Sequence, residues 1–255
     1  MGAGGRIGSI IAGMADADPD LELAAVVTRG GQGAGLAARF RCAEISDLAT
    51  ILPDLPGAVV IDFTAPEATV ATALTAAAHG NPMVVGTTGL DADQLDSLDR
   101  AARTAPLLWA PNMSVGVNAL LKVLPQLVRL LGPAYDLEMV ELHHGQKKDA
   151  PSGTALKIAQ VLAEARDWDL DEVGKYCREG IIGARPQDEI GVQTIRGGDV
   201  AGVHTVYFLG PGERIEVTHQ AHTRETFAQG ALRAAKWIAD KPAGQVYTFA
   251  DVLAG

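Results

Sequence analysis

The chain has 255 residues, of which 21 are Lys or Arg and 31 are Asp or Glu, so its formal net charge is −10 with histidine neutral. This length allows one large domain or two modest ones. An acidic chain without a basic cluster is a poor candidate for binding nucleic acid or an anionic membrane, and no apolar run reaches the roughly 20 residues of a membrane span.

The two cysteines, Cys42 and Cys177, are far apart and belong to no CxxC or Cys/His spacing. They are typical of a reduced cytoplasmic protein rather than of a disulfide framework or a zinc site. The start of the chain, MGAGGRIGSI, has no charged segment followed by an apolar one, so no secretory signal is visible. We therefore expect a cytoplasmic protein without a metal.

The chain begins with a glycine-rich loop of the form GxxGxxG, made of Gly2, Ala3, Gly4, Gly5, Arg6, Ile7 and Gly8. A helical pattern follows at 10–15, and an apolar strand candidate lies at 21–27. Glycines at this spacing permit a tight turn and let a pyrophosphate lie against a helix N-terminus. The order predicts the first βαβ unit of a dinucleotide-binding domain, with these residues as cofactor contacts.

The residues after the strand candidate at 21–27 carry information about the nucleotide. Sites for the non-phosphorylated cofactor usually have Asp or Glu there to bind the ribose, whereas Arg can accommodate a 2′-phosphate. Here the two residues are Thr28 and Arg29. They favour NADPH over NADH, although Arg29 could equally be a solvated loop residue.

A dinucleotide fold has a central strand before its glycine loop, but only Met1 precedes the loop here. We expect the printed start to be too late, with Met1 the last residue of an apolar strand encoded upstream. An upstream reading frame without an apolar segment of about five to eight residues would contradict this expectation.

Strands and helices then alternate. Apolar runs at 58–63, 82–85 and 107–110 predict buried parallel strands. Helices are expected from 66 to about 79 behind a capping box at 64–67, after Asp91 as N-cap, and at 117–131. The polar or glycine-rich residues at the strand ends are candidate cofactor contacts, although each alone could be an ordinary turn residue: Asp62, Phe63, Thr64, Gly86, Thr87, Thr88, Ala110, Pro111, Asn112 and Met113.

The stretch at 141–156, ELHHGQKKDAPSGTAL, concentrates more reactive side chains than any other. It connects a strand pattern at 136–140 to a helical pattern at 155–163. Ser152 or Thr154 can cap that helix, whose first free amides, with Lys147 nearby, would attract a carboxylate or phosphate. His143 titrates near neutral pH and could move a proton. The alternative is a solvated loop; adjacent histidines in an extended segment point to opposite sides and do not easily share a metal.

After residue 165 the pattern changes to short alternating segments at 190–196, 203–209 and 214–219, which predict an antiparallel meander. An amphipathic helix at 225–238 could return to the first domain. We therefore predict an α/β chain of two domains. Residues 1–114 and 225–255 form a doubly wound Rossmann-type domain, and residues 115–224 form an α+β domain with a mainly antiparallel sheet for substrate binding and oligomerisation.

With these motifs in view, the chain resembles the 4-hydroxy-tetrahydrodipicolinate (dihydrodipicolinate) reductase family of the diaminopimelate route to lysine. The resemblance runs nearly end to end, through GAGGRIG, VIDFT, GTTG, PNMSVGVN, ELHHGQKKDAPSGTA, REG, RGGDVAGVHTV and VTHQA. It implies reduction of 4-hydroxy-tetrahydrodipicolinate to tetrahydrodipicolinate with hydride from NADPH or NADH. It also implies a homotetramer built through the antiparallel sheet.

The resemblance assigns roles to residues of the 141–156 stretch. His143 corresponds to the proton donor and acceptor, and Lys147 to a proton donor and carboxylate partner. His144 corresponds to a substrate contact, and Gly153 with Thr154 to the helix-start amides that hold the second carboxylate of a small dicarboxylate substrate. Lys148 receives no role.

Two other readings compete with this one. A reductase of the semialdehyde or homoserine dehydrogenase type would need a catalytic Cys or a different Lys/Asp pair, and neither cysteine lies in a cleft motif. A non-catalytic nucleotide-sensing protein of the same fold would be expected to lack the loop histidine or lysine, and both are present.

Overall fold

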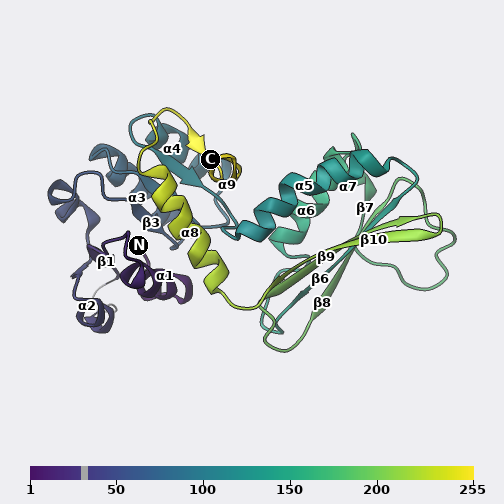
Figure 1. Cartoon of the computed structure of the whole chain (residues 1–255), viewed down its shortest axis with the longest axis horizontal. Helices are drawn as coiled ribbons and strands as arrows, with labels where there is room; N and C mark the ends of the chain where they lie inside the picture. The colour runs from purple at the N-terminus through teal and green to yellow at the C-terminus, as the bar shows by residue number, and fades with distance from the viewer. Residues whose placement is uncertain (30–33) are drawn as a thin grey trace. The chain divides into compact units, whose positions relative to one another are not determined.

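A computed structural model of the chain describes residues 1–29 and 34–255. Its contacts divide the chain into two compact units (Figure 1). Unit 1 contains Met1–Val115 and Arg224–Gly255, and unit 2 contains Gly116–Thr223. The polypeptide therefore leaves the first unit once, builds the second, and returns.

Unit 1 is built on parallel strands, as the sequence predicts. The strands are β1 (Ala25–Val27), β2 (Ala43–Ile45), β3 (Val60–Asp62), β4 (Met83–Val85), β5 (Leu107–Trp109) and β11 (Val246–Tyr247). Four of them pair in the order β11-β5-β4-β3, and β1 pairs with β2 separately. The backbone at 1–3 bridges the two groups, because Met1 N donates to Ile61 O (2.6 Å) and Gly2 N donates to Val27 O (3.0 Å).

Helices cover both faces of the four-stranded sheet of unit 1. The helices are α1 (Arg6–Ala17), α2 (Ala34–Phe40), α3 (Pro66–Ala78), α4 (Ala92–Ala102), α8 (Glu225–Ile238) and α9 (Phe249–Ala254), with 3₁₀ turns η1 (Leu48–Thr50) and η2 (Leu52–Asp54). Val84 and Leu108 pack with α1 and α8, whereas Met83 and Leu107 pack with α3 and α4. Neighbouring strand residues thus enter opposite cores, which explains the continuous apolar runs in the sequence.

Unit 2 is a five-stranded sheet in the order β10-β9-β6-β8-β7. Its strands are β6 (Asp136–His143), β7 (Gly174–Lys175), β8 (Ile190–Arg196), β9 (Gly202–Gly210) and β10 (Glu213–Ala221). Antiparallel pairing joins β10 to β9 and β9 to β6, while β8 runs parallel to both β6 and β7. The central strand is therefore β6, which carries the start of the polar stretch.

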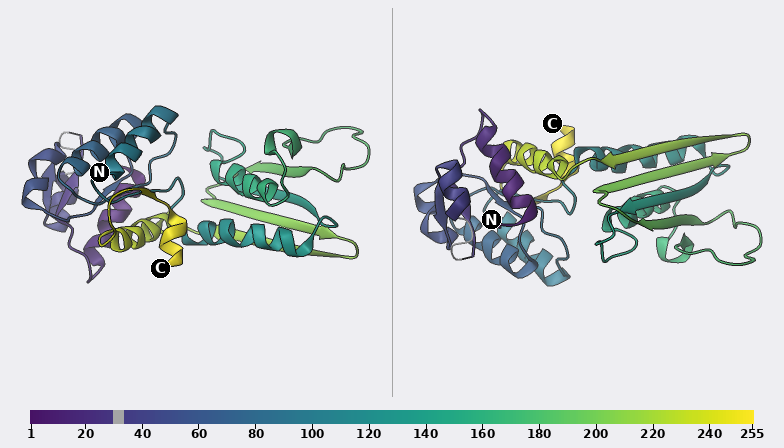
Figure 2. Two further views of the ribbon diagram at one scale, coloured as in Figure 1. Left: turned by 90° about the horizontal axis from the view of Figure 1, so that it is seen from above. Right: turned by 90° about the horizontal axis from the view of Figure 1, so that it is seen from below.

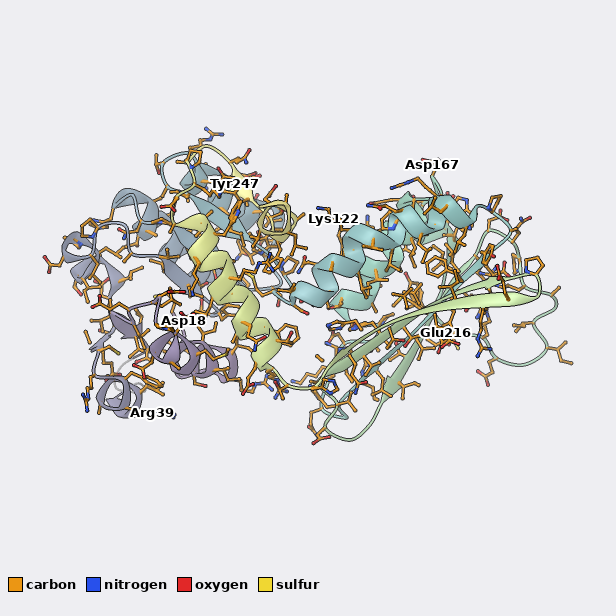
Figure 3. All side chains as sticks on the ribbon, viewed as in Figure 1. Asp18, Arg39, Lys122, Asp167, Glu216 and Tyr247 are labelled. Atoms are coloured by element: carbon orange, nitrogen blue, oxygen red, sulfur yellow. The ribbon has the colours of Figure 1, made fainter. Side chains whose placement is uncertain are left out.

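The helices of unit 2 lie on one face of this sheet (Figure 2). They are α5 (Val115–Leu131, of which all but the first residue belongs to unit 2), α6 (Gly153–Glu164) and α7 (Leu170–Val173). Side chains fill the space between α5, α6 and the strands (Figure 3). Phe208 and Met139 from the sheet meet Leu124 of α5 and Ile158 of α6 there, all of them fully buried.

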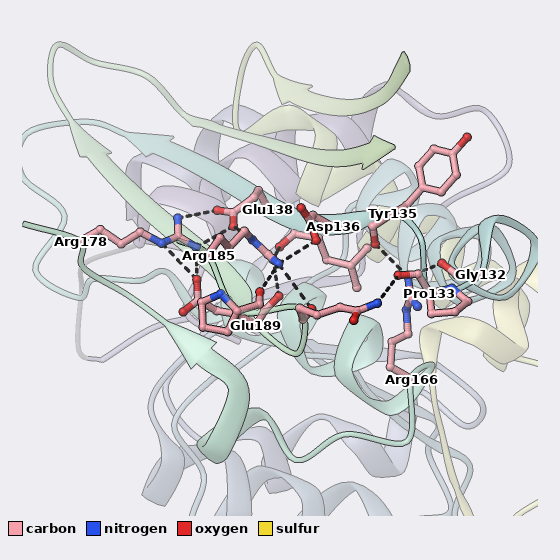
Figure 4. A network of polar contacts seen from close by, with 12 residues as sticks. Gly132, Pro133, Tyr135, Asp136, Glu138, Arg166, Arg178, Arg185 and Glu189 are labelled. Carbon is pink, nitrogen blue, oxygen red and sulfur yellow. Dashed lines mark hydrogen bonds and ion pairs between the residues drawn. The ribbon is translucent and has the colours of Figure 1, made fainter. Parts of the chain in front are cut away.

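The opposite face of the unit 2 sheet carries a network of ion pairs (Figure 4). Arg178 and Arg185, from the segment between β7 and β8, both bind Glu138 of β6. Arg178 also pairs with Glu189, and Arg185 with Asp136 at 2.9 Å. These contacts hold the segment that joins β7 to β8 against the sheet.

The prediction of an antiparallel meander is wrong in one respect. β9 and β10 form the expected hairpin, but β6 lies between β8 and β9, so these two strands are not neighbours. The connection at 197–201 crosses the end of β6 instead, with Gly197 N donating to His143 O (3.0 Å) and His144 N donating to Val200 O (2.9 Å). Sequence order alone could not reveal a strand inserted from a distant position.

Two local predictions also need correction. The Thr64 hydroxyl does not cap α3; it donates to the carboxylate of Asp62 (2.7 Å), and Ala65 is the N-cap without a side-chain bond. The polar stretch at 141–156 is not entirely a connection, because Glu141 and His143 still belong to β6. By contrast, Asp91 caps α4 as predicted and forms a complete capping box with Gln94.

Candidate active site

Strand alternation places two polar residues at the end of the buried face of β6. Leu137 and Met139 point into the core beneath the helices, and Glu141 and His143 continue the same face two and four residues later. Glu141 is completely buried and His143 is 8% exposed. The hydrophobic core therefore ends in a cluster of buried polar side chains at this end of β6.

His143 is the residue of this cluster that is best suited to transfer a proton. Its Nδ1 lies 2.5 Å from Glu141 Oε2. Burial lowers the pKa of His143 below its ordinary value, and the Glu141 carboxylate offsets only part of that effect. A histidine held against a carboxylate in this way can donate and accept a proton.

Glu141 stays ionised beside it. Burial alone would raise the pKa of Glu141, but hydrogen bonds from Arg196, His143 and the Ser152 amide outweigh burial and lower the pKa to about 2. Arg196 is the last residue of β8, and the register pairs it with His143. No role was predicted from the sequence for Glu141 or Arg196, and the position of Arg196 depends on the register between β6 and β8.

His204 of β9 is a third buried titratable residue in this cluster, beside Glu141 and His143. Its ring lies 5.2 Å from that of His143, edge to face, and its Nε2 lies 3.2 Å from Ser152 Oγ. Burial, reinforced by the neighbouring His143, lowers the pKa of His204 to about 3. His204 is therefore a neutral group that packs against His143 and does not compete with it for a proton.

The start of α6 lies beside the same cluster. Ser152 is the N-cap, and its Oγ accepts from Ala155 N at 3.1 Å. Its own amide is bound to Glu141 Oε1 (3.0 Å), so the helix is tied to the end of β6. Gly153, at the first helical position, is exposed, and Thr154 follows it. A helix start attracts anions through its amide groups and its dipole.

Lys147 supplies a positive charge near this helix start in the sequence. Its Nζ pairs with Asp149 Oδ1 at 2.9 Å, and its side chain is only 22% exposed. The neighbouring Lys148 is exposed, in keeping with its lack of a predicted role. His144, predicted as a substrate contact, is half-buried. Within unit 2, the predicted residues thus combine a proton carrier, a cation and a helix start, which suits an anionic ligand.

The predicted nucleotide contacts lie in unit 1. α1 begins at Arg6 with Gly5 as N-cap, so the loop at 2–5 leads directly into a helix start. At Gly8 a Cβ atom would lie only 2.2 Å from Gly2 O, closer than any real Cβ contact. Only glycine fits where the helix packs this closely on its own loop. Such a loop at a helix start fits the pyrophosphate of a dinucleotide.

The other predicted nucleotide contacts follow the carboxyl ends of neighbouring parallel strands. Thr28 is buried and Arg29 exposed after β1; Phe63 follows β3, and its ring lies against Gly86 after β4. The buried Asp62 ties two of these ends together, since its carboxylate accepts from Thr64 (2.7 Å) and Thr87 (3.0 Å). Thr88 follows β4, and Ala110, Pro111, Asn112 and Met113 follow β5.

Neither a metal-binding cluster nor a membrane-spanning helix is found among residues 1–29 and 34–255, which the structure describes. No group of three His, Cys, Asp or Glu side chains there is arranged to hold a metal ion. No helix of those residues is long and apolar enough to cross a membrane.

Replacing Gly8 with alanine is expected to weaken NADH and NADPH binding about tenfold or more, because the added methyl must push the loop away from the pyrophosphate position. Isothermal titration calorimetry would measure the loss of affinity for each nucleotide. Gly13→Ala is the matched control in the same helix, since its Cβ meets only the Phe40 ring at 3.7 Å. Equal affinities for the Gly8 variant and the unaltered chain would remove this loop from the nucleotide site.

Two family models together match most of the chain. The family model "Dihydrodipicolinate reductase, N-terminus" matches residues 1–113, and "Dihydrodipicolinate reductase, C-terminus" matches residues 116–253. The chain is 65% identical over 253 residues to a 4-hydroxy-tetrahydrodipicolinate reductase of Nitratidesulfovibrio vulgaris strain DP4, covering 99% of this chain and 97% of that protein. It is 63% identical, with the same coverage, to the protein of that name from Oleidesulfovibrio alaskensis.

A solved structure has the same fold. The dipicolinate-bound dihydrodipicolinate reductase from Paenisporosarcina sp. TG-14 superposes with a TM-score of 0.76 at 25% identity, covering 97% of this chain and 95% of that one. GenD2 of gentamicin A biosynthesis, solved with NAD, is similar in fold alone, with a TM-score of 0.61 at 16% identity.

Proposed function

Since the chain belongs to the dihydrodipicolinate reductase family, we propose that it reduces 4-hydroxy-tetrahydrodipicolinate to tetrahydrodipicolinate in the diaminopimelate route to lysine. The reaction consumes NADH or NADPH and one proton and releases water. The observation that carries the proposal is the grouping of His143, Lys147 and the start of α6 at one end of the unit 2 sheet.

Two features of this grouping suit a ring that bears two carboxylates. Lys147 offers an ammonium group to one carboxylate, in place of its present contact with Asp149. The amides of Gly153 and Thr154, at the start of α6, bind the other. Two contacts, one at each carboxylate, fix the orientation of the ring as well as its position, because a single ion pair would let the ring rotate. The solved relative with bound dipicolinate supports a dicarboxylate ligand.

His143 supplies the proton in this scheme. Reduction of the ring adds a hydride to carbon and requires a proton from elsewhere. His143 lies two residues beyond the ionised Glu141 on the same strand face and is largely shielded from water. His144, which follows β6 and is half-buried, contacts the substrate without exchanging this proton.

The nucleotide, when bound, supplies the hydride. The glycine loop Gly2–Ile7 and the start of α1 would hold its pyrophosphate, where the close approach at Gly8 leaves no room for a side chain. Phe63, Gly86, Thr87, Thr88 and Ala110–Met113, at the ends of the neighbouring strands, would supply the remaining contacts. Asp62 keeps two of these segments in fixed register through its threonine contacts.

The choice between the two nucleotides depends on charges beside the adenosine ribose. Arg29 attracts a 2′-phosphate and favours NADPH. A carboxylate is also present, although it comes from another strand: Glu44 of β2 accepts a hydrogen bond from the Thr28 hydroxyl at 2.9 Å. This negative charge repels a 2′-phosphate and lowers the preference that Arg29 creates. We therefore expect both nucleotides to be used, NADPH more readily.

Replacing Glu44 with glutamine is expected to raise the ratio of kcat/KM for NADPH to that for NADH by about tenfold, because one opposing charge is removed at similar shape. Steady-state kinetics with each nucleotide would measure the ratio. The exposed Glu22 gives a matched control, Glu22→Gln, whose ratio should stay at the wild-type value. An unchanged ratio in the Glu44 variant would mean that Glu44 does not affect the choice of nucleotide, and would leave that choice to Thr28 and Arg29.

The proposed activity is tested by following nucleotide oxidation at 340 nm with freshly prepared substrate. Substrate-dependent oxidation is expected with both nucleotides, with competitive inhibition by dipicolinate. Absence of turnover in a chain that binds nucleotide and dipicolinate normally would contradict the proposal and favour a non-catalytic role.

The face of the unit 2 sheet opposite its helices is the proposed surface for assembly into a homotetramer. This face carries apolar side chains that would otherwise meet water, including Ile195, which is 47% exposed, and Leu209, which is 36% exposed. Sedimentation equilibrium should give the mass of four chains, and a monomer at micromolar concentration would contradict the assignment.

A further inference from the structure

The carboxylate of Glu141 is the most completely surrounded ionised group in unit 2. Its Oε1 accepts hydrogen bonds from Ser152 N (3.0 Å), Thr194 Oγ1 (3.1 Å) and Arg196 Nη2 (2.7 Å). Its Oε2 accepts from Arg196 Nη1 (2.8 Å) and meets His143 Nδ1 (2.5 Å). Groups from β6, β8 and the start of α6 thus converge on one side chain that has no solvent exposure.

This arrangement fixes the chemistry of the His143 ring. An ionised carboxylate only accepts hydrogen bonds, so the ring nitrogen that faces it must carry a hydrogen. Nδ1 therefore keeps its hydrogen in both the neutral and the charged imidazole. Nε2 is left as the nitrogen that gains and loses the second proton. Ser152 N and Thr194 Oγ1 bind Oε1, and Arg196 binds both oxygens, so the carboxylate is fixed in the position that faces Nδ1.

The space at the other edge of the ring is kept open by a glycine. A Cβ atom at Gly202, the first residue of β9, would lie 3.0 Å from His143 Nε2 and 3.3 Å from its Cδ2. Any larger residue there would press on the nitrogen that must reach a ligand. Gly202 and Glu141 thus act on opposite edges of the same ring.

We propose that Glu141 is a positioning residue for His143: its carboxylate holds Nδ1–H and thereby makes Nε2 the nitrogen that delivers the proton to the substrate. The proposal rests on the proposed function and identifies the reacting atom within it. A carboxylate that orients a histidine in this way also favours the charged ring, which assists proton uptake between turnovers.

Several other charged or titratable groups face the His143 ring and are part of its electrostatic environment. Lys147 and Arg196 disfavour the charged ring, and Glu141 favours it. His204 packs edge-on and stays neutral, and behind it lies His219 of β10, 6.4 Å from the His204 ring. Removing the Glu141 charge leaves only groups that oppose protonation. The pKa of His143 must then fall, and the basic limb of the rate must move to lower pH.

Glu141→Gln separates this role from a merely structural one. In ¹⁵N-labelled protein, neutral His143 of the unaltered chain is expected to be protonated at Nδ1. In the variant, the neutral glutamine side chain can either accept from Nδ1 or donate to it. The Nε2–H form should therefore gain population, and the pKa of His143 should fall by about one unit or more. The basic limb of the kcat profile should shift by the same amount, and kcat at pH 7.5 should fall about tenfold or more.

Glu138→Gln is the matched control, since Glu138 lies three residues earlier on the same strand, also paired with arginine, but on the opposite face. It should leave the tautomer and pKa of His143 unchanged. Unchanged His143 resonances in Glu141→Gln, or an equal shift in Glu138→Gln, would overturn the proposal.

If Glu141→Gln does not fold, Glu141→Asp decides the question in the same experiment. Aspartate keeps the charge near Arg196 but is one methylene too short to hold Nδ1, so the Nδ1–H preference should be lost. A retained preference would overturn the proposal. The tautomer is measured without substrate or turnover, so failure of this inference is distinguishable from failure of the proposed reaction.

Discussion

Replacing His143 with glutamine is expected to lower kcat by roughly 10²- to 10⁴-fold, the usual contribution of a positioned general acid. Glutamine is similar in length and can keep a hydrogen bond to Glu141, but it cannot release a proton near neutral pH. Initial rates of nucleotide oxidation under saturating substrate measure the effect. NADPH binding, followed by calorimetry, should be unchanged because the predicted nucleotide contacts lie in unit 1.

The pH profile gives this prediction a second readout. Burial lowers the pKa of His143, so the acid form is present below that lowered value and is lost as the pH rises through it. The rate of the unaltered chain should therefore decline on the basic side, and His143→Gln should lose that limb. His79→Gln, at an exposed position in unit 1, serves as the control. Full turnover in His143→Gln would remove His143 from its role.

Replacing Lys147 with alanine is expected to lower kcat/KM for the dicarboxylate by roughly 30- to 100-fold, which corresponds to one charge-assisted hydrogen bond. If Lys147 mainly holds a carboxylate, KM rises and kcat changes less; if it also donates a proton, kcat falls as well. Complete substrate titrations separate these cases. Binding of NADPH should stay at its wild-type strength.

Lys148→Ala is the control for this substitution, because Lys148 is the adjacent lysine and is exposed. Its kinetic constants should match those of the unaltered chain. An equal loss in both variants would point to a general effect of positive charge in the loop. Unchanged kcat/KM in Lys147→Ala would exclude Lys147 as a carboxylate partner.

The parts of the fold that the sequence predicts correctly are those encoded locally. β8 and α8 begin and end at the predicted residues, and Asp91 caps α4. Errors occur where distant groups compete. Thr64 has the sequence context of a helix cap, but the buried Asp62 carboxylate takes its hydroxyl because three threonine donors are needed to keep that carboxylate satisfied.

In the candidate active site, too, residues that are close in sequence could be predicted, and a residue brought in from a distant strand could not. His143, Lys147, Gly153 and Thr154 occupy one short stretch, so their residue types and spacing suffice to suggest them. Arg196 lies 53 residues beyond His143 and reaches it only through the parallel register of β8 with β6. The sequence does contain one local signal for the buried carboxylate: Glu141 stands two residues before His143, and period-two alternation puts both on one face.

The nucleotide site illustrates a further limit. The predicted nucleotide loop is recognisable from its glycine spacing, but the carboxylate beside Thr28 is not, since Glu44 reaches Thr28 from the neighbouring strand β2. The strand at 43–45 is only three residues long and carries no periodic pattern that could predict it. Pairing between strands determines where that charge lies.

Transfer of deuterium from NADPH labelled at both C4 positions to the product, followed by mass spectrometry, tests the central claim most directly. The unaltered chain should yield tetrahydrodipicolinate with one deuterium bound to ring carbon, and His143→Gln should yield the same label at least about 100-fold more slowly. Product without deuterium, or labelled product formed equally fast by His143→Gln, would contradict the account.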